Sequence, residues 1–163
     1  TFGLLACYAI LYKILFNNFK NINQLWDRRF VFVAFLFLIS GATGSITALA
    51  DVLFPSASFY EGLMEDFDRT SALLTKLRIL HPIVATGLSV VLIIESRKIQ
   101  KDYKIDVKFL QLLVLIAVTL GILNVLSNII LLLSIFHLAI ADLLWITYIY
   151  VSMDKIKNKS AIN

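Results

Sequence analysis

The 163-residue sequence contains little charge, one cysteine and two histidines, and each scarcity limits the classes of protein to which the chain can belong. Only 16% of the residues are charged, 60% are hydrophobic, and the mean hydropathy is +0.86. This composition excludes an ordinary soluble domain and indicates a polytopic membrane protein. The single cysteine, Cys7, cannot form a disulfide within the chain, so it does not identify a redox compartment.

The chain also lacks the basic segment and short apolar run of a signal peptide at its start, and its first residue is Thr1 rather than methionine. We therefore expect a fragment whose beginning lies upstream. No basic patch is interleaved with aromatic residues, so the net charge of +4 predicts contact with anionic membrane lipids and no nucleic-acid partner.

Five apolar stretches predict an all-α, polytopic transmembrane helical bundle with four full spans and one partial N-terminal span. The full spans are each near the roughly 20 residues that cross a bilayer as a helix. We expect residues 1–16 to be the tail of a preceding transmembrane helix, 17–29 a cytoplasmic loop, 30–153 a four-helix bundle and 154–163 a cytoplasmic basic tail. The stretches are 1–16, 30–53, 73–94, 109–126 and 129–153.

Basic residues predict the orientation of this bundle. They gather around the first and third connections and after the last span, whereas the second connection, 54–72, is acidic and the fourth is uncharged. By the positive-inside rule the basic regions are cytoplasmic and the acidic loop lies outside.

The two histidines then fall at the same depth. His81 and His137 each lie eight residues into a span that runs inward, which places both about 12 Å from the outer face at 1.5 Å per residue. The two spans are separated by one intervening helix, so the imidazoles can face each other across the interior. Two neutral imidazoles at one level are the axial ligands that a six-coordinate heme iron requires.

Neighbouring residues extend this hypothesis. Arg78, one turn outward from His81, is placed to pair with heme propionates. Pro82 removes the amide that would bond to the Arg78 carbonyl, and we expect it to bend the helix at the histidine. Small residues at 40–50, and alanines one turn inward from each histidine, would let a flat macrocycle approach.

Structural interpretations compete with each of these. A histidine in a membrane helix can simply hydrogen-bond to a neighbouring helix, the small residues can serve helix packing, and Arg78 can extend to the headgroups. Asp142 fits either a proton relay or a hydrogen bond to a neighbouring helix. Glu95 lies beside basic residues and is predicted to form an exposed ion pair with them.

The order and spacing of GATGSITALADVLFPS, an acidic loop, LRILHPIVA and FHLAIADLLWI resemble the C-terminal half of a heme A synthase. The resemblance implies a heme A synthase-type oxidoreductase of the prokaryotic plasma membrane, which oxidises the heme O methyl group to a formyl group. It implies that His81 and His137 are the axial iron ligands of heme b, with Arg78 beside the heme. No catalytic residue is expected in this fragment, since the heme O substrate would bind in the missing N-terminal half.

That family implies heme O synthase and an electron donor as further partners. The segment departs from the family's substrate half, because Arg78 stands where a glutamate would precede the histidine and no cysteine pair is present. Two alternatives remain open: a membrane electron-transfer b-type cytochrome without its own chemistry, and a transporter with structural histidines. The role of the outer loop is also open, and its FYEGLMEDF stretch is predicted to be an amphipathic helix that lies on the membrane or caps the heme pocket.

Overall fold

A computed structural model describes residues 3, 6–11, 27–127 and 130–162, with side chains described up to Lys155. These residues are helical with short connections and include no strand. Four helices are long and apolar enough to cross a membrane, and the protein is an integral, multi-pass membrane protein. The prediction of an all-α bundle with four full spans is confirmed. The expected partial span at 1–16 and the loop at 17–29 lie largely outside the described residues.

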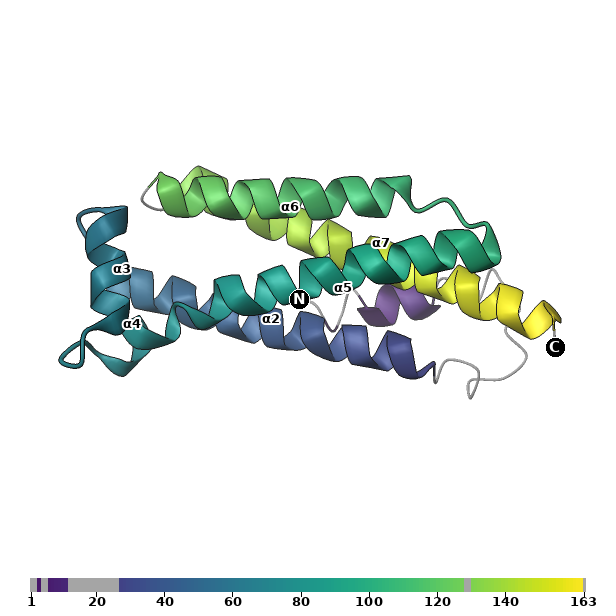
Figure 1. The fold of residues 1–163 in the computed structure, drawn as a ribbon, viewed down its shortest axis with the longest axis horizontal. Helices are drawn as coiled ribbons and strands as arrows, with labels where there is room; N and C mark the ends of the chain where they lie inside the picture. Colours follow the sequence, from purple (N-terminus) through teal and green to yellow (C-terminus); the bar gives the residue numbers. More distant parts are fainter. Residues whose placement is uncertain (1–2, 4–5, 12–26, 128–129, 163) are drawn as a thin grey trace.

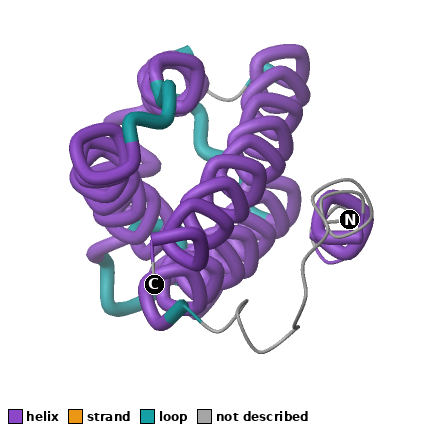
Figure 2. The backbone as a smooth tube through the Cα atoms, turned by 90° about the vertical axis from the view of Figure 1, so that its right-hand side faces the viewer, coloured by secondary structure: helices purple, strands orange, loops and turns teal. Residues whose placement is uncertain are grey.

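The long helices are α2 (Arg28–Leu53), α5 (Leu80–Tyr103), α6 (Lys108–Leu126) and α7 (Leu131–Ile162). They run side by side along the view direction of Figure 2. Helix α7 continues through the region expected to be a basic tail. Two short helices, α3 (Phe59–Phe67) and α4 (Leu73–Leu77), lie at one end of the bundle, called here the α3 end, and α3 lies across that end in Figure 1.

Local chemistry explains where these helices begin and end. The Asp27 carboxylate accepts hydrogen bonds from the first free amides of α2, at 3.0 and 3.2 Å, as an N-cap does. Ser58 caps α3 in the same way. Helix α5 ends at Tyr103 because Lys104 adopts a left-handed conformation with φ 55° and its amide bonds to the Gln100 carbonyl.

Helices α4 and α5 would form one span, but the chain breaks between them. Pro82 has no amide proton, so the Arg78 carbonyl loses its usual partner four residues on. That carbonyl instead accepts from the His81 amide, at 3.3 Å, and from the Thr47 hydroxyl of α2, also at 3.3 Å. The bend predicted at the histidine is confirmed, and it falls at Arg78 and Ile79, just before His81.

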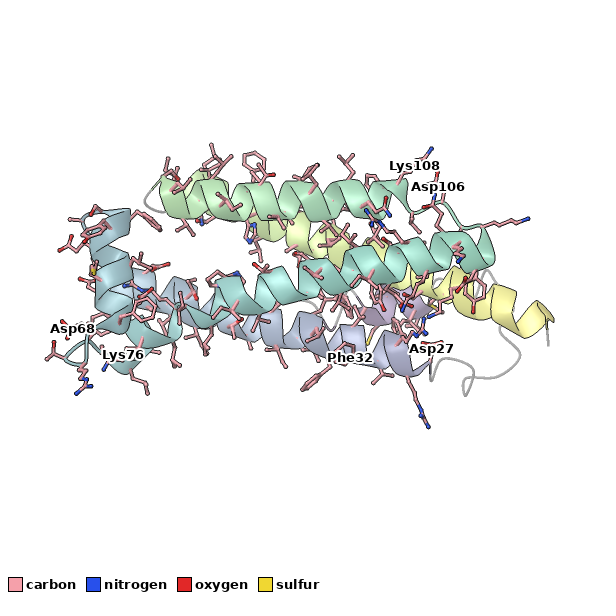
Figure 3. All side chains as sticks on the ribbon, viewed as in Figure 1. Asp27, Phe32, Asp68, Lys76, Asp106 and Lys108 are labelled. Atoms are coloured by element: carbon pink, nitrogen blue, oxygen red, sulfur yellow. The ribbon has the colours of Figure 1, made fainter. Side chains whose placement is uncertain are left out.

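The hydrophobic core fills only one part of the bundle. Aromatic rings from α2 and α7 form its centre, with Phe37 4.7 Å from Trp145 and 5.8 Å from Tyr148 between ring centroids. Outward-facing side chains such as Phe32 point away from the bundle, as lipid-facing residues do (Figure 3). The helix pairs α2/α5 and α6/α7 diverge toward the α3 end in Figure 1.

The opposite end of the bundle is held by a buried ion pair. The Lys155 ammonium of α7 lies 2.9 Å from the Glu95 carboxylate of α5 and 3.4 Å from the Asp27 carboxylate that caps α2. We call this the Lys155 end. The interpretation of Glu95 as an exposed ion pair was wrong, because α7 extends far enough to bring a buried lysine onto a glutamate that is only 6% exposed.

Candidate functional site

The two histidines face each other across the bundle. His81 comes from the first turn of α5 and His137 from the second turn of α7, and their ring centroids are 6.4 Å apart with the planes at 83°. The prediction that these side chains meet is confirmed. Both rings are half-buried.

This separation suits one metal ion between the rings. Two metal–nitrogen bonds of about 2 Å, plus two imidazole ring radii of about 1.1 Å, give a centroid separation of about 6 Å. Two rings in edge-to-face contact also have centroids about 4.5 to 7 Å apart, so this separation fits a direct ring contact as well as a bridging metal. The perpendicular planes do not conflict with axial ligation, because a ring can rotate about its metal–nitrogen bond without losing it.

The hydrophobic core stops at the level of the histidines. On α5 and α7 the described members of the core cluster begin seven residues beyond each histidine, at Leu88 and Leu144. On α2 and α6 they end at Phe37 and Ala117, before the helices reach that level. The interior toward the α3 end therefore has no buried hydrophobic side chains of this cluster among the described residues, although Ala50 of α2 is fully buried there.

Polar contacts fix the His81 ring against α2. The Thr43 hydroxyl can donate its one proton to a backbone carbonyl of its own helix, Ile39 at 2.9 Å or Ser40 at 3.1 Å. Its oxygen also lies 3.4 Å from Nδ1 of His81, and the tautomer of the ring decides which of the two groups donates.

His137 has a different environment. Its Nδ1 is buried without a hydrogen-bond partner among the described residues, as is Oδ1 of Asp142 on the same helix. An unsatisfied ring nitrogen is costly in a membrane interior. The histidine hydrogen bond to a neighbouring helix, offered above as the structural interpretation, is thus absent at this atom.

Arg78 lies at the α3 end, 8% exposed, with its guanidinium surrounded by acceptors. Its five N–H groups meet five oxygen atoms at 2.9 to 3.3 Å, so each donor has a partner. These are Asp66 Oδ1, Asp51 Oδ1, Glu65 Oε2, Ser56 Oγ and the Gly62 carbonyl. The pairing of Arg78 with heme propionates stays a prediction, and it would require some of these bonds to be exchanged.

These contacts attach α3 to the end of the bundle. The stretch FYEGLMEDF forms α3 over Phe59–Phe67, as predicted, and its Glu65 and Asp66 reach Arg78. Burial raises the pKa of Asp66, although Arg78 opposes that shift. A hydrogen bond from Ser56 lowers the pKa of Glu65. Figure 3 shows Asp68 and Lys76 at this same end, outside the cluster.

Comparison with known proteins gives two weak matches. A protoheme IX farnesyltransferase from one strain of Thermus thermophilus is 26% identical over 133 residues, which cover 77% of this chain and 21% of that protein. A protein of the same name from a second strain of that species is 41% identical over 56 residues, or 34% of this chain and 9% of that protein. The chain thus spans about a fifth or less of the length of these curated relatives. No family model matches the chain. No solved structure matches it either.

These names correct the sequence-based assignment. The relatives are enzymes by name, but protoheme IX farnesyltransferase is a different enzyme from heme A synthase. The resemblance to heme A synthase was therefore wrong, together with the oxidoreductase activity and the conversion of heme O to heme A that it implied. The resemblance rested on runs of small residues, a histidine followed by proline, and a second histidine in a later span. Such motifs can arise from helix packing around a site, and they do not specify one reaction.

Sequence reasoning missed three residues of this region. Gly44 and Gly121 contact the imidazoles of His81 and His137, and Thr43 contacts Nδ1 of His81. Gly44 and Thr43 lie in the small-residue run already noted, whereas Gly121 stood alone. The sequence carried a partial signal, because each glycine lies mid-helix in the span that precedes a histidine-bearing span, but it did not indicate which side of the helix faces the histidine.

Proposed function

We propose that this chain is a protoheme-binding membrane module in which His81 and His137 supply the two axial ligands of one heme b iron. The observation that carries the proposal is the pair of facing imidazoles, with ring centroids 6.4 Å apart, at the level where the core ends. The two ligands come from helices that are not consecutive, so the site exists only in the assembled bundle.

The ligand set favours a metal that brings its own macrocycle. Protein sites for free zinc or iron ordinarily need three or more side-chain ligands. Among the described residues no group of three or more histidine, cysteine, aspartate or glutamate side chains could hold a metal ion. An iron porphyrin supplies four nitrogen ligands itself, so the protein needs to supply only two.

The names of the relatives support the same ligand class. Each is named for farnesyl transfer to protoheme IX. We place this chain as the heme-holding part of a larger heme-modifying membrane enzyme, since it corresponds to a small share of those proteins. Farnesyl transfer itself would belong to the whole enzyme. In this chain the residues bind and orient the porphyrin: the histidines ligate the iron, Thr43 holds the His81 ring, and the aromatic core below excludes water.

Bound heme b would supply an iron centre that accepts or gives one electron, or a porphyrin available for modification. The proposal also keeps the orientation predicted from charge. The Lys155 end faces the cytoplasm and the α3 end faces outward, so the heme lies nearer the outer surface of a prokaryotic plasma membrane.

Heme titration of the purified chain tests this function. We expect one heme b per chain and the spectrum of a six-coordinate, low-spin iron. His81→Ala and His137→Ala should each give a five-coordinate, high-spin spectrum with weaker binding. Thr147→Ala is the matched control, because Thr147 is on α7 and, among the described residues, its hydroxyl bonds only to the Leu143 carbonyl of its own helix. A wild-type chain that binds no heme, or histidine variants that keep the wild-type spectrum, would overturn the proposal.

A second arm separates the two uses of the heme. The loaded chain is mixed with excess apomyoglobin, and heme transfer is followed by absorbance. Transfer within minutes identifies an exchangeable substrate heme, and retention for hours identifies a resident cofactor. Both results require the bis-histidine site.

A further inference from the structure

Each imidazole lies against a glycine on the long helix that precedes its own. A Cβ atom built on Gly44 of α2 would lie 3.0 Å from Cε1 of His81, and one on Gly121 of α6 would lie 3.2 Å from Cε1 of His137. Carbon atoms in good contact lie about 3.5 to 4.0 Å apart. A side chain at either position would therefore push the ring away from the helix.

In both cases the edge of the ring that faces the glycine is the one with Cε1 and Nδ1. A Cβ on Gly44 would lie 3.2 Å from Nδ1 of His81, and one on Gly121 would lie 3.7 Å from Nδ1 of His137. Each ring therefore lies this close to the backbone of the facing helix only because the facing residue has no side chain.

The arrangement therefore occurs twice. Helices α2 and α5 form one antiparallel pair and α6 and α7 form another, and in each pair a glycine on the first helix faces a histidine on the second. In the first pair Thr43 adds a polar contact to Nδ1, at 3.4 Å. In the second pair Nδ1 of His137 is buried without a hydrogen-bond partner among the described residues.

Resting on the proposed function, we infer that Gly44 and Gly121 are positioning residues: without side chains they let the two heme-ligating imidazoles lie against α2 and α6, and so they set the orientation of both rings toward the iron. The glycines act through the histidines and do not touch the iron.

Alanine substitutions at the glycines test this role. Alanine is a better helix former than glycine, so Gly44→Ala and Gly121→Ala should retain the wild-type far-ultraviolet circular dichroism. We expect heme affinity to fall about 10- to 100-fold, as for other groups that orient metal ligands, and a high-spin fraction to appear. The effect should be larger for Gly44→Ala, whose new methyl group meets the closer contact.

Gly87→Ala is the matched control. Gly87 lies on α5 with no atom within 4 Å of a built Cβ, so this variant should bind heme as the wild type does. If Gly44→Ala and Gly121→Ala bind heme with the same affinity and spin state as Gly87→Ala, the positioning role is wrong while the bis-histidine site stands.

A measurement without heme tests the same inference independently. The chain has two histidines, so ¹⁵N-histidine labelling of the apoprotein gives signals from two rings only, and the histidine variants assign them. Gly44→Ala should shift the ring signals of His81, Gly121→Ala should shift those of His137, and Gly87→Ala should shift neither. Gly44→Ala and Gly121→Ala spectra equal to that of the wild type would overturn the inference. Failure of the wild type to bind heme would overturn the proposed function instead.

Discussion

Replacing Lys155 by methionine should destabilise the bundle strongly. The Lys155 side chain is 6% exposed and the Glu95 side chain 8% exposed, and their charged atoms lie 2.9 Å apart. Removing one partner of a buried ion pair leaves the other charge buried, which costs about 3 to 5 kcal/mol. Arg29 lies 3.6 Å from the other Glu95 oxygen and compensates part of this charge, so we expect a loss of about 3 kcal/mol.

Thermal unfolding in detergent, followed by circular dichroism, measures this loss. For a chain of this size about 1 kcal/mol lowers the melting temperature by roughly 2 to 4 °C, so Lys155→Met should melt about 6 to 12 °C below the wild type. Lys98→Met is the control, since Lys98 is exposed at the same end of α5, and it should leave the melting temperature unchanged.

The double variant Lys155→Met/Glu95→Met separates a lost charge pair from lost packing. Two methionines of similar volume leave no unpaired charge at position 95, and Asp27 loses Lys155 but keeps its two backbone hydrogen bonds. Much of the stability should therefore return, with a coupling energy of about 2 kcal/mol. A Lys155→Met chain that melts with the wild type would refute the reasoning, as would a double variant less stable than the single one.

Two further predictions concern the polar contacts at the ends of the bundle. Burial tends to raise the pKa of Asp27, but hydrogen bonds from Phe30 and Arg29 and the charge of Lys155 hold this pKa below its ordinary 3.8. These contacts with the ionised carboxylate therefore stabilise the fold above pH 3.8, and this contribution is lost as the pH falls below that value. Asp27→Asn should accordingly flatten the dependence of melting temperature on pH between about pH 5 and pH 3. Arg78→Lys leaves three donors for five acceptors, so hydrogen exchange of the α3 amides should accelerate about tenfold, a local loss of about 1.4 kcal/mol.

Each of these has its own control. An Asp27→Asn chain with the wild-type pH dependence would show that Asp27 does not carry the effect. Arg69→Lys changes an exposed arginine of the adjoining turn and should leave the exchange of α3 unchanged; equal acceleration in both arginine variants would show that the Arg78 contacts do not hold α3.

The sequence was sufficient to predict that His81 and His137 meet. Their depth depends only on the number of residues from the start of each span, and the rise per residue of a helix is fixed. The break near Pro82 was predictable for a similar reason, because a missing amide proton has a local consequence. The four spans followed from hydropathy alone.

Other features depended on helix rotation and could not be read from one sequence. The contacts of Gly44 and Gly121 require the facing side of each helix to be known, and glycine gives no hydropathy signal for it. The burial of Glu95 depends on Lys155, which lies 60 residues away on α7. The contacts of Arg78 with Asp51, Glu65 and Asp66 required the acidic loop to fold back over the span, whereas charge counting only placed that loop at one end.

The division of the histidines between two helix pairs links ligand binding to assembly. The α2/α5 pair and the α6/α7 pair are joined by the short connection between Tyr103 and Lys108, and each carries one of the two proposed iron ligands. Ligand that binds only when the pairs are associated stabilises that association by RT ln(1 + [L]/Kd), about 4 kcal/mol at a thousandfold excess over Kd. Iron porphyrin would thus act as a non-covalent crosslink across the part of the bundle without a core, and the amount of folded protein in a membrane would follow the supply of heme.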